Sequence, residues 1–389
     1  MLDLIREKFN ISYSYLVSAT GCKNNIEIAP DILDKHIQSF LESIKNMILT
    51  LRSGYLSFEL IAEALKSMIE ISSDTVRRIF ETTVDDTEIQ MESSFRIVHY
   101  DEQHPKKGKA QKFRLSLFDG ILKQMIAEEL SDGFNEEIVE DFLDRHLPRG
   151  QMIFLVSDQL PLYNELFMRL RPGYIVHQHC LLHLNKNIVL DFHRNCSFSD
   201  ELYKYMLLNI FYDRRREIEY LQSAKQRERT YLEKHGEKEY QNWLLEMKKD
   251  FHIFVHDLEK KRRKICKRKK IPNRMNMWSL KEARKYLNNL LMNIDIFPSA
   301  VRRRIVKIQK GWSRFTAFYR LENAPATNNA LENYFSCSCK QIKKKQHRRN
   351  TAMKRQWKLY AMRRAGLLKY DGPSLFDVIS ILVPFRFPT

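Results

Sequence analysis

The chain has 389 residues, 43% of them hydrophobic, and a formal net charge of +18 at pH 7. This length allows two or three domains, and the apolar fraction is enough for a real core. The charge predicts a polyanionic partner, first of all nucleic acid. A membrane surface is less favoured because no basic helix with a clean apolar face stands out. Six cysteines without a CxxC pair favour reduced thiols in a cytoplasmic protein, and no stretch predicts a secretory signal or a membrane span.

Residues 1–90 are predicted to form a helical N-terminal domain. Apolar residues recur at helical spacing through Tyr55–Met68. Ser72 or its neighbour then caps a second helix that turns Arg77 and Arg78 outward. A helix, a turn and a helix with exposed arginines is typical of a DNA-binding helix-turn-helix, and the alternative is two packed helices with a solvated basic face.

Residues 91–190 change to a strand pattern. Alternating apolar residues predict strands at Phe95–Glu102 and Lys112–Asp119, and a third short strand follows them. A helix, the continuous apolar strand Gln151–Asp158, another helix and a short strand in GYIVHQHC complete the pattern. The order β-β-β-α-β-α-β is that of an RNase H-like α/β domain, a mixed sheet flanked by helices.

The remaining sequence is predicted to be an all-helical insertion at 191–310 and a completion of the core at 311–389. The insertion carries the basic run KKRRKICKRKK. The last part ends in a basic helix, because Lys340–Arg364 has many lysines and arginines and no acid, whereas a merely solvated face normally mixes signs. Its predicted contacts to DNA phosphates are Lys343, Lys344, Arg348, Arg349, Arg355 and Lys358.

Three carboxylates stand at positions suited to phosphodiester chemistry. Asp101 and Asp158 end two strands that would lie side by side, and Glu332 on a later helix would close the cluster. Hard oxygen ligands suit Mg²⁺ or Mn²⁺, and two such ions hold the attacking and leaving oxygens in line.

Each acid also has a structural alternative. Asp158 is suited to cap the helix that follows it, and Glu332 has a capping-box partner in Asn329. The first acid is not fixed by pattern alone, because Glu102 and Asp119 lie close to Asp101 in the sequence or on the neighbouring strand.

The order of three sequence blocks resembles that of a known family. The blocks VHYDEQHPKKGKAQKFRLSLFD, FLVSDQLPLYNELF with VHQHCLLHLNKNI, and TNNALENYFS are similar to the catalytic blocks of DDE transposases, in the branch of Mutator-like and related prokaryotic insertion-sequence enzymes. Cys180 and His183 match the C/DxxH motif of that branch. The resemblance covers Phe95–Ile188 and Trp312–Arg364, and the long gap before the glutamate fits a helical insertion.

The resemblance implies a DNA transposase that cuts and joins DNA strands in a prokaryotic cytoplasm. Asp101, Asp158 and Glu332 would be the catalytic residues and the ligands of two Mg²⁺ or Mn²⁺ ions. The partners would be double-stranded transposon ends and target DNA, bound by a homo-oligomer. Two other interpretations stay open: a catalytically inactive DNA-binding descendant, and a nuclease of the same fold without strand transfer.

Two further features have competing interpretations. His177 and His179 with Cys180 and His183 have residue types found in zinc sites, or they hold the corner between strand and helix structurally. Trp312 is either a stacking partner for a flipped base or a core residue.

Overall fold

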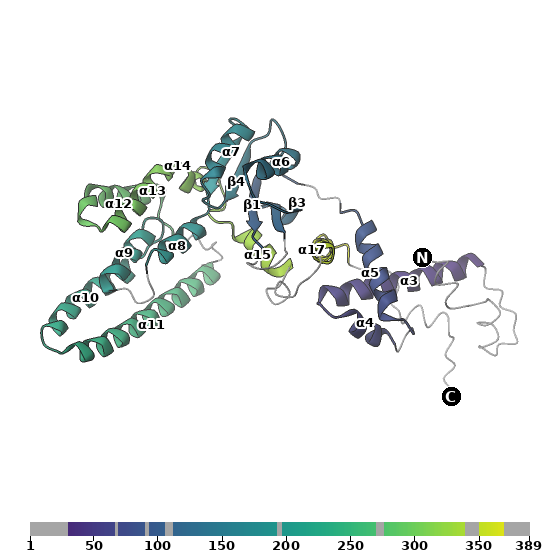
Figure 1. Cartoon of the computed structure of the whole chain (residues 1–389), viewed down its shortest axis with the longest axis horizontal. Helices are drawn as coiled ribbons and strands as arrows, with labels where there is room; N and C mark the ends of the chain where they lie inside the picture. The colour runs from purple at the N-terminus through teal and green to yellow at the C-terminus, as the bar shows by residue number, and fades with distance from the viewer. Residues whose placement is uncertain are drawn as a thin grey trace. The chain divides into compact units, whose positions relative to one another are not determined.

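The computed structural model divides the chain into two compact units, Met1–Gln90 with Ser338–Thr389, and Met91–Cys337 (Figure 1). The residues it describes are 30–66, 69–89, 93–105, 112–192, 197–269, 276–338 and 350–368.

The first unit is helical. It comprises α3 (Pro30–Ser53), α4 (Phe58–Leu65), α5 (Ser73–Asp86) and α17 (Asn350–Arg364). The expected cap of α5 is present, because the Ser72 hydroxyl accepts a hydrogen bond from a backbone N–H in the first turn. The apolar faces of these helices meet in one core, with buried residues Ile44, Ile48, Leu49, Ile61, Leu65, Val76, Phe80, Val84, Leu359 and Met362.

The basic helix α17 belongs to this helical unit. The sequence placed it in the segment 311–389 that completes the α/β core. In the structure it packs against α3 and α5 instead. The reason is that Leu359 and Met362 bury their side chains in the helical core.

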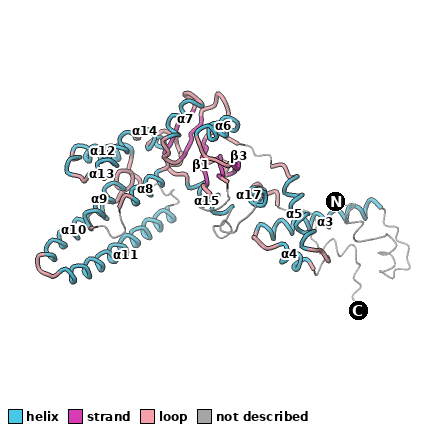
Figure 2. Tube along the Cα trace, viewed as in Figure 1, coloured by secondary structure: helices cyan, strands magenta, loops and turns pink. Residues whose placement is uncertain are grey.

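The second unit contains a five-stranded mixed sheet in the order β3-β2-β1-β4-β5 (Figure 2). Strands β1 and β2 pair antiparallel, as do β2 and β3, whereas β4 is parallel to both β1 and β5. The expected succession of strands and helices is confirmed. The strand bounds are Ile97–Gln103, Phe113–Asp119, Gln124–Ser131, Ile153–Ser157 and Ile175–His179.

Helices cover both faces of this sheet. Helices α6 (Glu136–His146) and α7 (Leu162–Leu170) share one buried cluster with Val98 and Tyr100 of β1. Ile97, one position earlier on the strand, belongs to the cluster on the opposite face, which includes α8 (Leu181–Leu190). Successive side chains of a strand point to opposite faces, so β1 separates two apolar cores.

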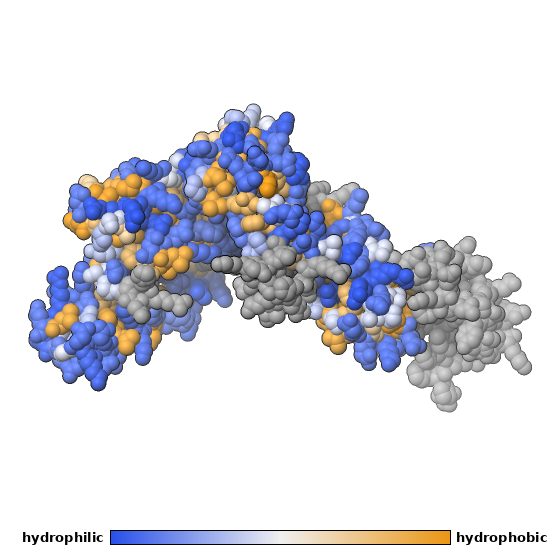
Figure 3. All heavy atoms as spheres, in the orientation of Figure 1, coloured by the Kyte–Doolittle hydropathy of each residue, from blue (hydrophilic) through white to orange (hydrophobic). Residues whose placement is uncertain are grey.

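The secondary-structure elements described between α8 and α15 (Asn329–Ser338) are helices, apart from one isolated bridge between Tyr212 and Met277. The first three of these helices form a branch with its own small core around Phe198 and Phe251, whereas later ones contribute to the cluster that includes Ile97. The surface is mainly hydrophilic, with apolar side chains gathered in places (Figure 3). The helical elements are α9 Phe198–Leu208, α10 Arg215–Leu232, α11 Glu237–Lys269, α12 Leu280–Met292, η2 Ile294–Ile296, α13 Ser299–Lys310, α14 Trp312–Phe315 and η3 Ala317–Tyr319.

None of the helices within the described ranges has the length and apolar character that a membrane crossing requires.

Candidate active site

Asp101 lies on β1, on the sheet face that α15 covers. Along β1, the side chain of Asp101 points to the same face as that of His99, which contacts the start of α15. Tyr100, which lies between them in the sequence, points to the opposite face, toward α6 and α7. The pKa of Asp101 is raised well above its ordinary value, first by burial and then by the negative charges of Glu102, Asp158 and Glu332. A carboxyl group responds in this way when other carboxylates lie close to it, so the three predicted acids share one electrostatic environment.

The two competitors of Asp101 have other partners. Glu102 points to the opposite face, where its carboxylate accepts a hydrogen bond from the Tyr163 hydroxyl at 2.5 Å. Asp119 is fully buried and accepts hydrogen bonds from Ser93, Ser94 and the backbone N–H groups after β2. Asp119 therefore fixes the end of β2, and Asp101 is the strand-borne acid left facing α15.

Asp158 follows the last residue of β4, and burial raises its pKa. One carboxylate oxygen accepts a hydrogen bond from the Leu160 backbone N–H at 3.1 Å. The side chain therefore supports the turn before α7 but does not cap that helix, whose N-cap residue is Pro161 without a side-chain cap. The same residue also contributes to the raised pKa of Asp101, so the two roles are compatible.

Glu332 lies in the first turn of α15 and directs its carboxylate toward α8. The Lys186 ammonium is 3.1 Å from one of its oxygens and 3.3 Å from the other. His183 Nε2 is 3.5 Å from the first of these oxygens. The carboxylate thus has partners on α8, which is a different arrangement from the capping box predicted with Asn329.

Asn328 attaches the start of α15 to the sheet. Its side-chain oxygen lies 2.9 Å from His99 Nδ1, and its amide nitrogen donates to the Tyr100 carbonyl oxygen at 3.0 Å. Its backbone N–H donates to Cys180 Sγ at 3.1 Å. The residue is completely buried, so these bonds fix the position of α15, and with it Glu332, relative to β1. The sequence reasoning missed this residue, although it stands in the quoted TNNALENYFS block.

The histidines and the cysteine beside the site have separate partners. His177 Nε2 lies 2.8 Å from the Ser157 hydroxyl, and His179 Nε2 lies 3.0 Å from the Asn164 side-chain oxygen. Burial raises the pKa of the Cys180 thiol to about 11. The Cys180 sulfur accepts a hydrogen bond from the Asn328 backbone N–H. These contacts support the structural role for Cys180 at the corner between β5 and α8.

Across the described ranges, no group of three or more His, Cys, Asp or Glu side chains is arranged to hold a metal ion. The three acids nevertheless have the chemistry of a hard-cation site. They are oxygen ligands, and burial followed by the charges of neighbouring acids raises the pKa of Asp101, an effect that a bound divalent cation would oppose. Glu332 is paired with Lys186 in this conformation, so joining the other two acids at an ion would require its carboxylate to leave that lysine.

The predicted DNA contacts fall into different environments. Arg77 and Arg78 are exposed on α5, and Arg77 lies 3.4 Å from Asp74. Trp312 is half-buried and stacks on Phe211, with ring centroids 5.6 Å apart. This packing agrees with the alternative that the tryptophan is a core residue. A DNA-contacting role for these side chains stays a prediction.

Two of the predicted phosphate contacts on α17 have partners within the helical unit. Arg355 forms ion pairs with Glu81 at 2.8 Å and Asp85 at 2.7 Å. Lys358 donates a hydrogen bond to the Asp85 backbone oxygen at 2.8 Å. Both side chains thereby join α17 to α5. The other four, Lys343, Lys344, Arg348 and Arg349, lie outside the described residues.

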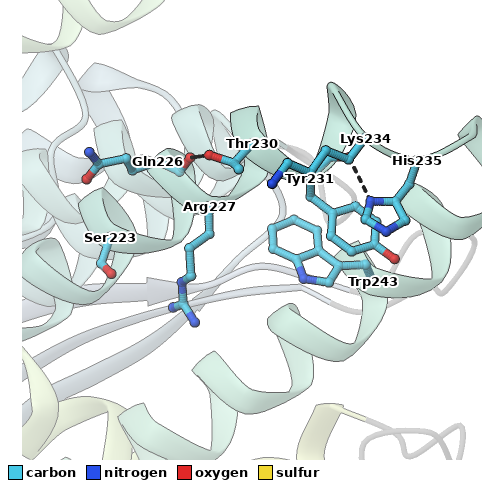
Figure 4. A pocket seen from close by; sticks show the side chains of 8 residues that line it. All are labelled: Ser223, Gln226, Arg227, Thr230, Tyr231, Lys234, His235 and Trp243. Atoms are coloured by element: carbon cyan, nitrogen blue, oxygen red, sulfur yellow. Dashed lines mark hydrogen bonds between the residues drawn. The ribbon is translucent and has the colours of Figure 1, made fainter.

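A cavity of about 380 Å³ lies away from the carboxylates, between α10 and α11. Figure 4 shows the Tyr231 ring between His235 and Trp243, with ring centroids 3.9 and 5.0 Å away. Arg227 and Lys234 also line this cavity. The stacked rings hold the tip of the helical hairpin together, because they come from both helices and the turn between them.

In comparisons with known proteins, no family model matches this sequence, and no curated protein matches it either.

Proposed function

We propose that the chain is a DDE-type DNA transposase with an RNase H-like core, which cuts DNA strands and joins them to a target. The observation that carries the proposal is the placement of Asp101 on β1 and of Asp158 at the end of the adjacent parallel strand, with Glu332 on the helix that Asn328 attaches to β1. These acids come from β1, the end of β4 and α15, and all three positions were selected from the order of the sequence blocks. In the strand order β3-β2-β1-β4-β5, only β2 runs opposite to the other four strands, and this mixed sheet is compatible with the RNase H-like core that the resemblance implies.

The C/DxxH motif supports the same interpretation through its contacts. Cys180 accepts a hydrogen bond from the residue that precedes α15, and His183 approaches Glu332 one turn further along α8. The motif therefore orients the helix that carries the third acid. Such a positioning role explains why a cysteine and a histidine would occur together there without binding a metal.

Asp101, Asp158 and Glu332 would hold Mg²⁺ or Mn²⁺, which would neutralise charge on the attacking and leaving oxygens of the phosphodiester. In the metal-free protein, Lys186 forms an ion pair with the Glu332 carboxylate, and this pairing limits the repulsion between the three acids. The expected partners remain double-stranded transposon ends and target DNA, bound by a homo-oligomer in a prokaryotic cytoplasm.

The test is a strand-transfer reaction with the full chain. A labelled duplex made from the DNA that flanks the gene, with a free 3′-hydroxyl, is incubated with supercoiled plasmid and Mn²⁺. We expect label to become joined to the plasmid, and Asp158→Asn to reduce joining on the order of 10³-fold because charge on the reacting oxygens is no longer balanced. Mn²⁺ binding, measured by calorimetry, should weaken in the same variant.

The matched control is Asp132→Asn, because Asp132 is an exposed carboxylate at the end of β3 whose side chain is 82% accessible. This variant should join DNA at the wild-type rate. Cleavage of the plasmid without joining would identify a nuclease instead. DNA binding without Mn²⁺ binding or cleavage would identify an inactive descendant, and either result contradicts the proposal.

A further inference from the structure

A small cavity of about 160 Å³ lies directly beyond Asp158. Gln159 follows that aspartate in the sequence and lines the cavity, together with the start of α7 and the end of β5. The opposite wall comes from the last turn of α13 and from α14. This position is beside the proposed active site but involves none of its three carboxylates.

The cavity is lined by three cationic side chains, Lys307, Lys310 and Arg314. Within the described part of the chain, none of the three forms an ion pair, and no carboxylate lines the cavity. The field of these cations reaches a buried neighbour: the pKa of His179 is lowered to about 4, first by burial and then by Arg314 and Lys307. The cavity is therefore an electropositive site without a protein anion in it.

Two buried polar atoms at this cavity also lack partners among the described residues. His179 is only 5% exposed, and its Nδ1 makes no hydrogen bond, although its Nε2 contacts Asn164. The side-chain oxygen Oε1 of Gln159 is likewise buried and unpaired. Both atoms are shielded from solvent and lie behind the cavity wall, so the case for a ligand rests on the cations that line the cavity.

The backbone between α13 and α14 brings the cations together. A Cβ atom at Gly311 would lie 2.8 Å from Cε2 of Phe315, so a side chain there would displace that ring. Glycine thus permits the tight turn after which Arg314 returns to the side of Lys307 and Lys310. The helix α7 also begins at the cavity, and the partial positive charge of its N-terminus adds to the field.

We propose that this cavity binds a phosphate group of the DNA backbone next to the phosphodiester that the acids process. The inference rests on the proposed function for the identity of the polyanion, whereas the anion site itself follows from the cavity. A phosphate would supply the negative charge that the three cations lack and acceptor oxygens for their N–H donors. It would hold the strand on the far side of Asp158 from Glu332 and so help to align the scissile bond.

The structural alternative is that the two lysines only stabilise the C-terminal end of α13, where cations interact favourably with the helix dipole. That role would affect the stability of the helix and leave DNA affinity to the overall charge. Arg314 argues against it as a complete explanation, because it belongs to the next helix and yet lines the same cavity.

The experiment measures binding in the absence of catalysis. Full-length protein carrying Asp101→Asn is titrated in EDTA against a fluorescent duplex, and anisotropy is followed over a range of salt concentrations. The test variant adds Lys307→Gln and Lys310→Gln. The matched control adds Arg227→Gln and Lys234→Gln, which removes the same charge from the other cavity (Figure 4).

We expect the test variant to bind DNA on the order of tenfold more weakly, with a log–log salt slope lower by roughly 0.9 for each phosphate that the protein no longer neutralises. The control should change affinity less than threefold. Equal decreases in the two variants would mean that only net charge matters and would overturn the proposal. Arg314→Gln provides a second variant if the double variant unfolds, and Arg314→Lys should retain most of the affinity.

A competition with inorganic phosphate separates the DNA backbone from a free anion as the ligand. If the test substitutions abolish binding of inorganic phosphate but leave DNA affinity unchanged, the cavity serves a free phosphate and the backbone assignment is wrong. These measurements use no strand transfer. If the chain is not a transposase, the difference in DNA affinity between the test and control variants should still be measurable. If that difference is absent, the strand-transfer assay still tests the transposase proposal independently.

Discussion

An aspartate of the helical unit has a cationic partner, whereas an aspartate of the α/β unit lies among other acids. On α5, Asp85 faces the guanidinium of Arg355, and hydrogen bonding to that group lowers the pKa of the carboxyl. On β1, Asp101 faces other acids, and its pKa is raised. The first arrangement stabilises a fold. The second costs stability, as we expect of a site that holds the proposed catalytic acids.

The cations show the same contrast. Arg355 and Lys358 have partners on α5, whereas Lys307 and Lys310 have no ion pair within the described residues. The sequence alone predicted that the lysines and arginines of α17 bind phosphates. A cation that already joins two helices is less available to DNA, and an unpaired cation beside a proposed active site is more available.

The largest effect on stability should come from Asn328, whose hydrogen bonds attach α15 to the sheet. Asn328→Ala leaves His99 Nδ1 and the Tyr100 carbonyl without their partner in a buried environment. We expect the free energy of unfolding to fall by about 2–4 kcal/mol, measured by urea denaturation followed by circular dichroism. Asn333→Ala, at an exposed position of the same helix, is the control and should change it by less than about 0.5 kcal/mol.

A smaller effect, of opposite sign, is expected for Asp101. Because its pKa is raised in the folded chain, its favourable contribution is present at low pH and is lost as the pH rises through the folded value. Asp101→Asn should therefore stabilise the metal-free protein at neutral pH, where the wild-type carboxyl is held in an unfavourable environment. Thermal unfolding in EDTA at pH 5 and pH 8 measures this, and the gain should be larger at pH 8.

The same linkage predicts that Mn²⁺ binds the wild-type protein more tightly as the pH rises, with release of protons. A loss of stability in Asp101→Asn at pH 8 would show that this carboxyl has a favourable partner. The contrast between Asp101 and Asp85 would then disappear.

The smallest effect should come from Arg355, whose charge is paired within the helical unit. Arg355→Gln removes ion pairs to partly exposed partners on α5, and we expect a loss of about 0.5–1 kcal/mol in unfolding free energy. Its affinity for duplex DNA should change less than threefold. The control Lys354→Gln removes an exposed charge from the same helix and should leave stability unchanged. A large loss of DNA affinity in Arg355→Gln alone would restore this arginine to the DNA-binding surface.

The sheet could be predicted from sequence because its signal is local. Alternation marked β1 and β2, and a continuous apolar run marked β4, since buried parallel strands are apolar on both faces. Strand alternation also separates Asp101 from Glu102, because adjacent residues of a strand point to opposite faces of the sheet. Glu332 needed the resemblance, because its own surroundings also fit a capping residue.

The remaining features depend on contacts between distant segments. Lys186 and Glu332 are 146 residues apart, and nothing near either residue predicts their pairing. The cavity beyond Asp158 combines α7, β5 and α13, so its lysines appear in the sequence as an ordinary helix end. The placement of α17 followed from two buried apolar residues within a strongly basic segment, where charge concealed the packing signal.

The bond between Asn328 and Cys180 has a consequence for how the gene can change. It joins residues 148 positions apart, and the Leu181 N–H also donates to the Ala326 carbonyl at 2.9 Å. The chain therefore leaves the sheet and returns to it at nearly the same point. Between these points, α9, α10 and α11 form a module with its own small core, whereas α14 and η3 contact β5. Segments added or removed at the far tip of that module, at the turn between α10 and α11, would leave the geometry of the acids intact. Changes in length are thereby expected in a part of the chain that the sheet does not constrain.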